Sequence, residues 1–471
     1  MKITIKGIFL LIAMGLFTAC FEDNDDNLTS SSSIKDFIWK AMNKVYLYKA
    51  DVDDLADERF ETSQEYQDYL NAFYSPEILF ESLIHDRENV DRFSVITSDY
   101  FALEQQLSGV SKSHGAEFNF YYTPGSNASV FGIVRLVLPN SSASLSNLTR
   151  GHVFNKINGQ DLTNSNIGSF LNNDSFTLNL AVYNDNGTES TDDDSLSDTN
   201  TSITLTKTVY TENPVYYHSV IEQNNEKIGY LMYNGFVNEF DNELNQVFGI
   251  FKSANVDHLV LDLRYNSGGS IRTATALGSM ITGNFNNQIF TTLKYNETLS
   301  DNNYNFNFTN ELSDGTSINS LNLDQLYVLT SNRSASASEM IINSLDAYID
   351  VIQIGDNTVG KSQASQIIYD SPNFNRNNAN PAHTYALLPL IAITVNKNNT
   401  EVPPSGIAPD HEFVEKAANY GTIGDTEEPL LKKALDLIQG SNKTSEPIQT
   451  PPPLLNSNVS KTLETLMFVD F

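Results

Sequence analysis

A serine and a lysine that lie 25 residues apart in this chain could together hydrolyse an acyl bond. Ser336 stands directly before an apolar run, and Lys361 follows a strand-like run and a glycine turn. A serine hydroxyl is a poor nucleophile near neutral pH and needs a base beside it. A lysine can supply that base only if its pKa falls from about 10.4 to about 7–8. The hypothesis of a serine–lysine hydrolase therefore requires Lys361 to be largely buried.

Ser336 also fits a purely structural role. Ser336 and Glu339 have the spacing of a capping box, in which both side chains bond to backbone N–H groups at a helix start. The same position suits catalysis, because the N–H of Ala337 and the helix dipole would face an oxyanion formed at Ser336. The local sequence leaves both interpretations open.

A pair of glycines could complete such a site. Gly268 and Gly269 follow the strand-like residues 258–264 and precede an expected helix. Adjacent glycines permit positive φ and close approach of the backbone, so one of their N–H groups could be a second oxyanion donor. The alternative is a plain turn between a strand and a helix. In either case Asp262 and Arg264 are expected to form a structural ion pair.

Other chemical patterns in the chain are weaker. Residues 355–362 match the phosphate-loop pattern, but the residues from Ser365 onward predict a strand where that motif needs a helix. The histidines are scattered without metal-ligand spacing, so no metal site is predicted. His218 or His383 remains an alternative base for Ser336.

The expected helices and strands divide the chain into regions of different secondary structure. Residues 34–104 have mostly helical spacing, and residues 105–212 contain short β-type runs with a polar hairpin tip at 184–202. Strands and helices alternate over residues 213–438, which predicts an α/β layer architecture. Residues 439–471 are rich in Ser, Asn and Pro, and we expect a disordered tail apart from a short apolar end. The whole chain is thus an α/β (α+β multidomain) protein.

The N-terminus predicts export and lipidation. Lys2 and Lys6 precede an apolar run at residues 7–19 that has the length of a signal peptide, so residues 1–19 are expected to be cleaved. The run ends at Cys20, in a sequence that resembles the lipobox of bacterial lipoproteins. Residues 20–33, with their acidic run, would be a tether. The formal charge of −30 argues against nucleic acid as a partner.

Four segments, taken together and in order, resemble the carboxyl-terminal processing (tail-specific) serine proteases. They are Val-Leu-Asp-Leu-Arg-Tyr-Asn-Ser-Gly-Gly at 260–269, Ser-Ala-Ser-Ala-Ser-Glu at 334–339, Thr-Val-Gly-Lys at 358–361 and Ser-Gly-Ile-Ala-Pro-Asp at 405–410. The resemblance implies that residues 213–438 form the protease core, that Ser336 is the nucleophile and that Lys361 is the general base. It places the oxyanion hole at the N–H of Ala337 and of Gly268 or Gly269.

The resemblance leaves the residue that orients Lys361 open. The family often has a glutamine four residues after the lysine, and here that position is Ser365, with Gln363 and Gln366 close by in sequence. The family also carries a PDZ-like domain, and residues 139–143 and 148–159 within 105–212 resemble it. Such domains bind a peptide C-terminus by strand addition. The expected carboxylate loop is at residues 114–118.

The sequence therefore predicts a serine endopeptidase that cleaves exported protein substrates near their C-termini without a metal or cofactor. Membrane contact is expected only through the lipid at Cys20, on an outer-membrane lipoprotein of the bacterial cell envelope. Two alternatives remain: a non-catalytic peptide-binding lipoprotein of the same fold, and a serine hydrolase acting on a non-protein ester.

Overall fold

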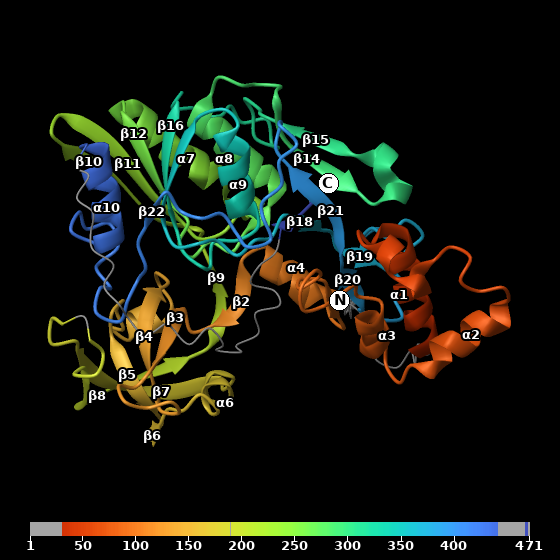
Figure 1. Ribbon diagram of the computed structural model, residues 1–471, viewed down its shortest axis with the longest axis horizontal. Helices are drawn as coiled ribbons and strands as arrows, with labels where there is room; N and C mark the ends of the chain where they lie inside the picture. The colour runs from red at the N-terminus through yellow and green to blue at the C-terminus, as the bar shows by residue number, and fades with distance from the viewer. Residues whose placement is uncertain (1–30, 189, 441–466, 470–471) are drawn as a thin grey trace, which may run out of the picture.

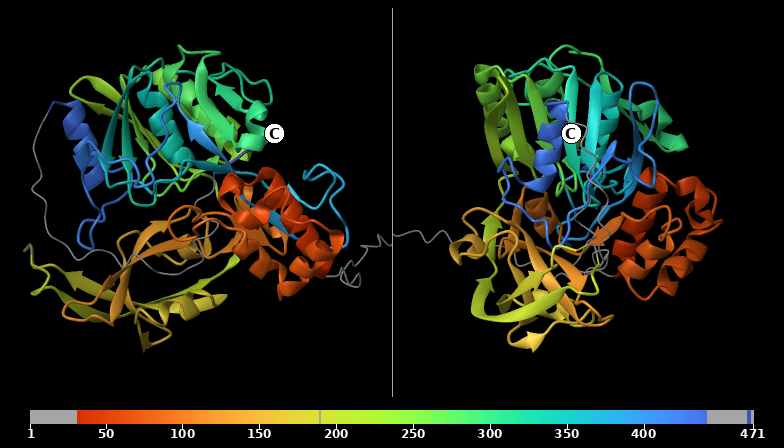
Figure 2. Two further views of the ribbon diagram at one scale, coloured as in Figure 1. Left: turned by 45° about the vertical axis from the view of Figure 1, so that its right-hand side comes forward. Right: turned by 60° about the vertical axis from the view of Figure 1, so that its left-hand side comes forward.

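The chain folds into three regions that follow one another in sequence, and the computed structural model describes residues 31–440, except 189, together with 467–469 (Figure 1). Helices at the N-terminus lie on one side, a β domain lies below, and an α/β core lies above. The two views in Figure 2 show the β domain beneath the core and the N-terminal helices beside both. The predicted mixed α/β class is confirmed. The signal peptide and Cys20 lie outside the described residues.

The N-terminal region is mostly helical and is anchored on the core. Its elements are α1 (Ser31–Val45), α2 (Ser63–Ala72), α3 (Pro76–Ser82), β1 (Val95–Thr97) and α4 (Tyr100–Leu107). Thr62 and Ser75 cap α2 and α3 by accepting hydrogen bonds from backbone N–H groups three residues further on. The apolar faces of α1 and α3 pack together and also against Ile368 and Leu387 of the core. This packing places the end of the helical region against the core.

The β domain has its own sheet and its own apolar centre. Its elements are β2 (Val110–Ser113), β3 (Ala116–Tyr122), β4 (Val130–Val137), α5 (Ser142–Leu145), β5 (Val153–Ile157), β6 (Gln160–Asp161), α6 (Ile167–Leu171), β7 (Ser175–Asn184), β8 (Ser195–Thr206) and β9 (Thr208–Thr211). The strand order is β3-β4-β5-β7-β8, with β6 beside β5, and β2 pairs with β9. The hairpin tip is shorter than predicted, because β8 pairs with β7 from Ser195 onward.

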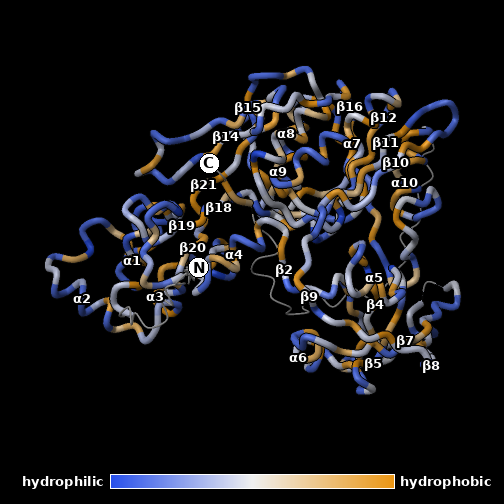
Figure 3. The backbone as a smooth tube through the Cα atoms, turned by 180° about the vertical axis from the view of Figure 1, so that it is seen from behind, coloured by the Kyte–Doolittle hydropathy of each residue, from blue (hydrophilic) through white to orange (hydrophobic). Residues whose placement is uncertain are grey.

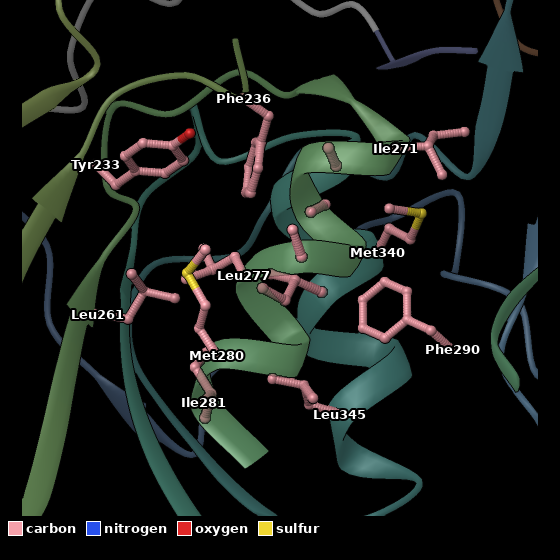
Figure 4. Close-up of a cluster of buried hydrophobic side chains, with 14 of the residues drawn as sticks. Tyr233, Phe236, Leu261, Ile271, Leu277, Met280, Ile281, Phe290, Met340 and Leu345 are labelled. Atoms are coloured by element: carbon pink, nitrogen blue, oxygen red, sulfur yellow. The ribbon is translucent and has the colours of Figure 1, made fainter. Parts of the chain in front are cut away.

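The α/β core is built on a six-stranded sheet in the order β10-β11-β12-β16-β17-β22. Its elements are β10 (Val215–Gln223), β11 (Glu226–Tyr233), α7 (Asp241–Ala254), β12 (His258–Asp262), α8 (Ile271–Thr282), β16 (Gln325–Thr330), α9 (Ala337–Asp346), β17 (Asp350–Gly355), β22 (His411–Glu412) and α10 (Pro429–Ile438). All neighbours are parallel except β10, which is antiparallel to β11. Helices α7 to α9 cover one face and α10 the other. Figure 4 shows Leu277 and Met280 of α8 between Leu261 of the sheet and Phe290, with Met340 of α9 beside Phe290.

A second sheet lies beyond α8 and α9 in the order β13-β23-β18-β21-β14-β15. Its strands are β13 (Gly269–Ser270), β14 (Ile289–Tyr295), β15 (Tyr304–Asn307), β18 (Gln363–Ser365), β21 (Leu390–Val395) and β23 (Met467–Phe468). Strands β19 (Ile368–Tyr369) and β20 (Ala386–Leu388) join β1 in a third sheet.

Strand β23 forms from the short apolar end that the prediction of a disordered tail excepted. Residues 467–469 are ordered, because their apolar side chains are buried and their backbone pairs with both neighbouring strands. Residues 441–466 lie outside the described part of the chain.

The hydropathy pattern agrees with this layering. Figure 3 shows hydrophobic positions along the central strands and β21, whereas many outer loops are hydrophilic. Among the described residues, none of the helices combines the length and apolarity that crossing a membrane requires.

Candidate active site

One buried carboxylate holds the segments of Ser336 and Lys361 together. Glu339, in the first turn of α9, accepts through Oε2 from the backbone N–H of Ser336 at 2.8 Å and from that of Lys361 at 2.9 Å. Its Oε1 accepts from the N–H of Gly360 at 2.7 Å and from the hydroxyl of Thr358 at 2.5 Å. Hydrogen bonds to a charged acceptor are roughly twice as strong as neutral ones. The backbone nitrogens of Ser336 and Lys361, 25 residues apart in sequence, therefore lie within two hydrogen-bond lengths of each other.

The backbone of Ser336 is strained and its hydroxyl is unpartnered. The residue has φ of 65° and ψ of −116°, a conformation that costs a non-glycine residue about 1–3 kcal/mol. Its Oγ is buried and has no hydrogen-bond partner in the described part of the chain. The predicted capping-box arrangement of Ser336 and Glu339 is present, and within it Glu339 accepts from the N–H of Ser336. Strain together with an unused buried hydroxyl is more typical of a reactive serine than of a cap.

Lys361 lies in an apolar, enclosed position. Its side chain is fully buried, and its ammonium nitrogen lies 4.8 Å from the ring centre of Phe93. Burial lowers the pKa of Lys361 to about 7, against the opposing effects of the Asp91 and Glu339 charges. The guanidinium of Arg92 also lowers this pKa and donates to the carbonyl of Gly360 at 3.1 Å. The burial that a lysine base requires is present.

The glycine pair lies next to the start of α9. Gly268 and Gly269 have φ of 119° and 135°, and a Cβ added at Gly269 would stand 2.2 Å from the carbonyl oxygen of Phe236. Asn266, two residues before the pair, accepts through its backbone carbonyl from the N–H of Ala335 at 3.2 Å and from the hydroxyl of Ser338 at 2.9 Å. These bonds attach the glycine turn to both sides of Ser336.

The last of the four sequence segments supports the lysine turn. Ile407 donates its N–H to the hydroxyl of Thr358 at 2.7 Å, and its carbonyl accepts from the N–H of Thr358 at 3.2 Å. Gly360 and Gly406 both have positive φ, and neither has room for a Cβ beside the opposing backbone. All four segments therefore meet at one place.

A cleft of about 830 Å³ opens beside this place. Its lining runs from loop 114–118 of the β domain to Gly268 and Gly269, and it also includes Val359 and Phe468. The cleft thus extends from the β domain to the glycine turn that lies next to the start of α9.

Comparison with known proteins agrees with this geometry. The peptidase family S41 model matches residues 227–413, and the model of the peptidase S41 N-terminal domain matches residues 33–95. The chain therefore contains domains of peptidase family S41. The S41 model spans every element that carries the predicted site, from β11 to β22.

Two relatives of this S41 chain illustrate the likeness. A carboxyl-terminal-processing protease from a Picosynechococcus species is 24% identical over 247 residues, which are 51% of this chain and 52% of that protein. The match thus spans about half of that relative. A crystal structure assigned to the S41 proteases, from Bacteroides fragilis, has a TM-score of 0.68 at 26% identity and covers 86% of this chain and 97% of that one.

The three candidates for orienting the lysine of this S41 chain differ in their surroundings. Ser365, on β18, is fully buried with an unpartnered Oγ among the described residues. Gln363 is buried and faces the hydroxyl of Tyr48, whose pKa is raised to about 12, chiefly by burial. Gln366 lies beyond the end of β18 and is only partly buried. An orienting role toward Lys361 stays a prediction for each of the three.

Asp262 and Arg264 form the expected structural ion pair, within a larger network that the sequence did not predict. Their charged groups lie 2.8 Å apart, and both residues are fully buried. Arg264 also bonds Glu428 at 2.7 Å and Glu415 at 3.0 Å. Arg150 of the β domain donates to Glu415. The positive charges of Arg150 and Arg264 lower the pKa of the Glu415 carboxyl to about 2, against the opposing effect of burial. The network joins the β domain to the core.

The predicted carboxylate loop of the β domain is closed. His114 is buried, which lowers its pKa to about 4, and its Nδ1 accepts from the N–H of Ala116 at 3.0 Å. The N–H of Gly115 donates to the hydroxyl of Ser113 at 2.9 Å. A peptide carboxylate at this loop would have to displace these internal bonds, and the PDZ-like function of the domain stays a prediction.

The competing motifs find no support in the fold. A strand, β18, follows Lys361 where a phosphate loop needs a helix. His383 pairs with Asp370 at 3.0 Å, and the ring of His218 lies against Phe251. No group of three or more His, Cys, Asp or Glu side chains within the described residues is arranged to hold a metal ion.

Sequence reasoning missed the residues that surround the lysine. Asp91, Arg92 and Phe93 come from the N-terminal region, and Arg92 meets Gly360 across 268 residues of chain. No local pattern marks them. Glu339 was identified only as a capping residue, although its position three residues after Ser336 was the available signal.

Proposed function

We propose that this chain is a serine endopeptidase that uses a Ser336–Lys361 dyad to cleave exported protein substrates near their C-termini. One observation carries the proposal: Glu339 fixes the backbones of both residues while burial lowers the pKa of Lys361 to about 7. A lysine with that pKa is substantially neutral at physiological pH and can accept a proton.

In the proposed reaction, neutral Lys361 Nζ takes the proton of the Ser336 hydroxyl as Oγ attacks the substrate carbonyl. The C–O bond forms, and the carbonyl oxygen becomes the oxyanion. The N–H of Ala337 at the start of α9, and an N–H of Gly268 or Gly269, would stabilise that charge. Lys361 then returns the proton to the leaving amine, the C–N bond breaks, and water hydrolyses the acyl-enzyme by the same proton route. Apart from water, these steps use only side chains and backbone N–H groups of this chain.

The β domain supports a peptide rather than a small ester as substrate. The cleft that reaches the glycine turn is lined over much of its length by that domain, and a small ester would not need so long a path. We also propose that the chain is an exported lipoprotein of the bacterial outer membrane, held by a lipid on Cys20. Its partners would then be unfolded or extended segments of other exported proteins.

The dyad is tested with a denatured protein substrate. Ser336→Ala and Lys361→Ala should each abolish cleavage, with thermal unfolding used to show that both variants are folded. Lys361→Arg should fail as well, because a guanidinium does not release its proton to act as a base. The exposed Lys252→Met on α7 is a matched control and should retain full activity. Cleavage by purified Ser336→Ala would refute the dyad and would favour another hydrolase or a binding protein.

A further inference from the structure

Residues 467–469, here called the β23 segment, lie inside the proposed active site. Met467 pairs with Gly269, and Phe468 pairs with Ser270, in a parallel ladder with β13. On its other edge, Phe468 pairs with Ser365 of β18, and the N–H of Val469 donates to the carbonyl of Ser365 at 3.0 Å. The segment thus fills the position between the glycine turn and the strand that follows Lys361.

The side chains of the β23 segment are buried on two sides. Met467 is 0% and Val469 is 6% exposed, and both belong to the main apolar cluster of the core. Phe468 points the other way and packs with Leu103 of α4 and Leu388 of β20. This alternation is that of a true strand, and the segment contacts both the core and the N-terminal region.

The segment also occupies the edge that a substrate would need. Gly269 pairs with Phe236 on one edge and with Met467 on the other, and the N–H of Gly268 donates to Asn266 Oδ1 at 2.9 Å. A peptide strand could not pair with Gly269 while both of its edges are taken. Ser336 and Lys361 are both 0% exposed in this arrangement.

We propose that the β23 segment is an intramolecular inhibitory strand that holds the peptidase closed until a peptide substrate displaces it. The proposal rests on the proposed function. The substrate that displaces the segment is an extended peptide with an apolar, an aromatic and an apolar residue in succession. Such a peptide can fill the positions that Met467, Phe468 and Val469 occupy. A tethered strand competes at an effective concentration on the order of 1 mM. If the segment itself binds the groove with a Kd of about 10 μM, it would weaken the binding of a free peptide roughly 100-fold.

The first test measures binding without catalysis. A fluorescent peptide with the sequence of residues 465–471 is titrated against Ser336→Ala and against Ser336→Ala combined with Phe468→Asp, which places a charge among apolar neighbours. We expect the second protein to bind the peptide at least about tenfold more tightly. A peptide carrying Asp at the Phe468 position should bind neither protein. Equal affinity of the labelled peptide for both proteins would overturn the proposal.

The second test measures activity in proteins that keep Ser336. Phe468→Asp should raise kcat/KM on a denatured substrate at least about tenfold, and Tyr74→Asp, at a side chain 93% exposed on the N-terminal region, should leave it unchanged. Val469→Pro, which removes the N–H that bonds Ser365, gives the same test without a buried charge should Phe468→Asp fail to fold. Unchanged or lower activity in a folded variant would count against the inhibitory strand. If neither the wild type nor any variant that keeps Ser336 cleaves the substrate, the proposed function is refuted. The peptide titration would still decide whether the β23 segment blocks the groove.

Discussion

Replacing Lys361 by methionine should stabilise the protein in a manner that depends on pH. Methionine has a similar length and no charge, so Lys361→Met removes the cost of keeping an amine in an apolar site. The pKa of Lys361 is about 7 in the folded chain and about 10.4 in an unfolded one. Between these values the unfolded chain binds a proton that the folded chain does not, so the stability of the wild type rises as pH rises.

The size of the effect follows from those two pKa values. At pH 7 the shift destabilises the folded state by about 4 kcal/mol, and at pH 10 by about 1 kcal/mol. The advantage of methionine over lysine should therefore shrink by roughly 3–4 kcal/mol between pH 7 and pH 10. Packing differences between the two side chains are the same at both pH values and cancel in the comparison.

The assay is urea unfolding at the two pH values, followed by circular dichroism. Both proteins carry Ser336→Ala, which prevents self-digestion during the measurement. Lys252→Met, on the exposed side of α7, serves as the control and should change stability equally at both pH values. If the difference between Lys361 and methionine is the same at pH 7 and pH 10, then Lys361 is not held neutral by burial, and the argument for a lysine base is refuted.

Three further predictions address the surroundings of the dyad and the anchor. Activity should fall about tenfold per pH unit below pH 7 as Lys361 becomes protonated. In Asp91→Asn this acidic fall in activity should begin at a lower pH, because the charge of Asp91 raises the pKa of Lys361. An unchanged pH profile in Asp91→Asn would exclude that effect of Asp91 on Lys361. Gly269→Ala should cost more than about 2 kcal/mol in unfolding free energy and abolish cleavage, because its Cβ would collide with the carbonyl of Phe236; a folded, active variant would contradict the close approach. Cys20→Ser should release the protein from membranes on fractionation, and persistent membrane association would rule out a lipid on that residue.

The sequence predicts the alternating core well because its signals are local. Apolar runs such as the one that forms β12 and the helical spacing of α9 need only a few neighbouring residues to be recognised. The spacing of Ser336 and Lys361 also follows from short segments around each residue. These segments identify the candidate dyad before any contact is known.

The surroundings of the dyad depend on contacts that no window of sequence contains. Asp91 and Phe93 reach Lys361 from another region of the chain, and Arg150 reaches Glu415 from the β domain. The polar composition of β8 concealed a strand, because backbone pairing with β7 decided its structure. Residues 467–469 likewise gained their order from pairing with β13 and β18 rather than from their own propensity.

The shared carboxylate of Glu339 also has a consequence for the order in which the protein matures. The strained backbone of Ser336 is held by a hydrogen bond to an oxygen that binds Lys361 at the same time. Until the lysine turn docks on α9, neither the strain of the serine nor the apolar shell that lowers the pKa of the lysine is in place. A chain that is only partly folded therefore carries an inert serine and a protonated lysine. Proteolytic competence would arrive only with the last long-range contacts, so a nascent chain is protected from its own chemistry while it folds.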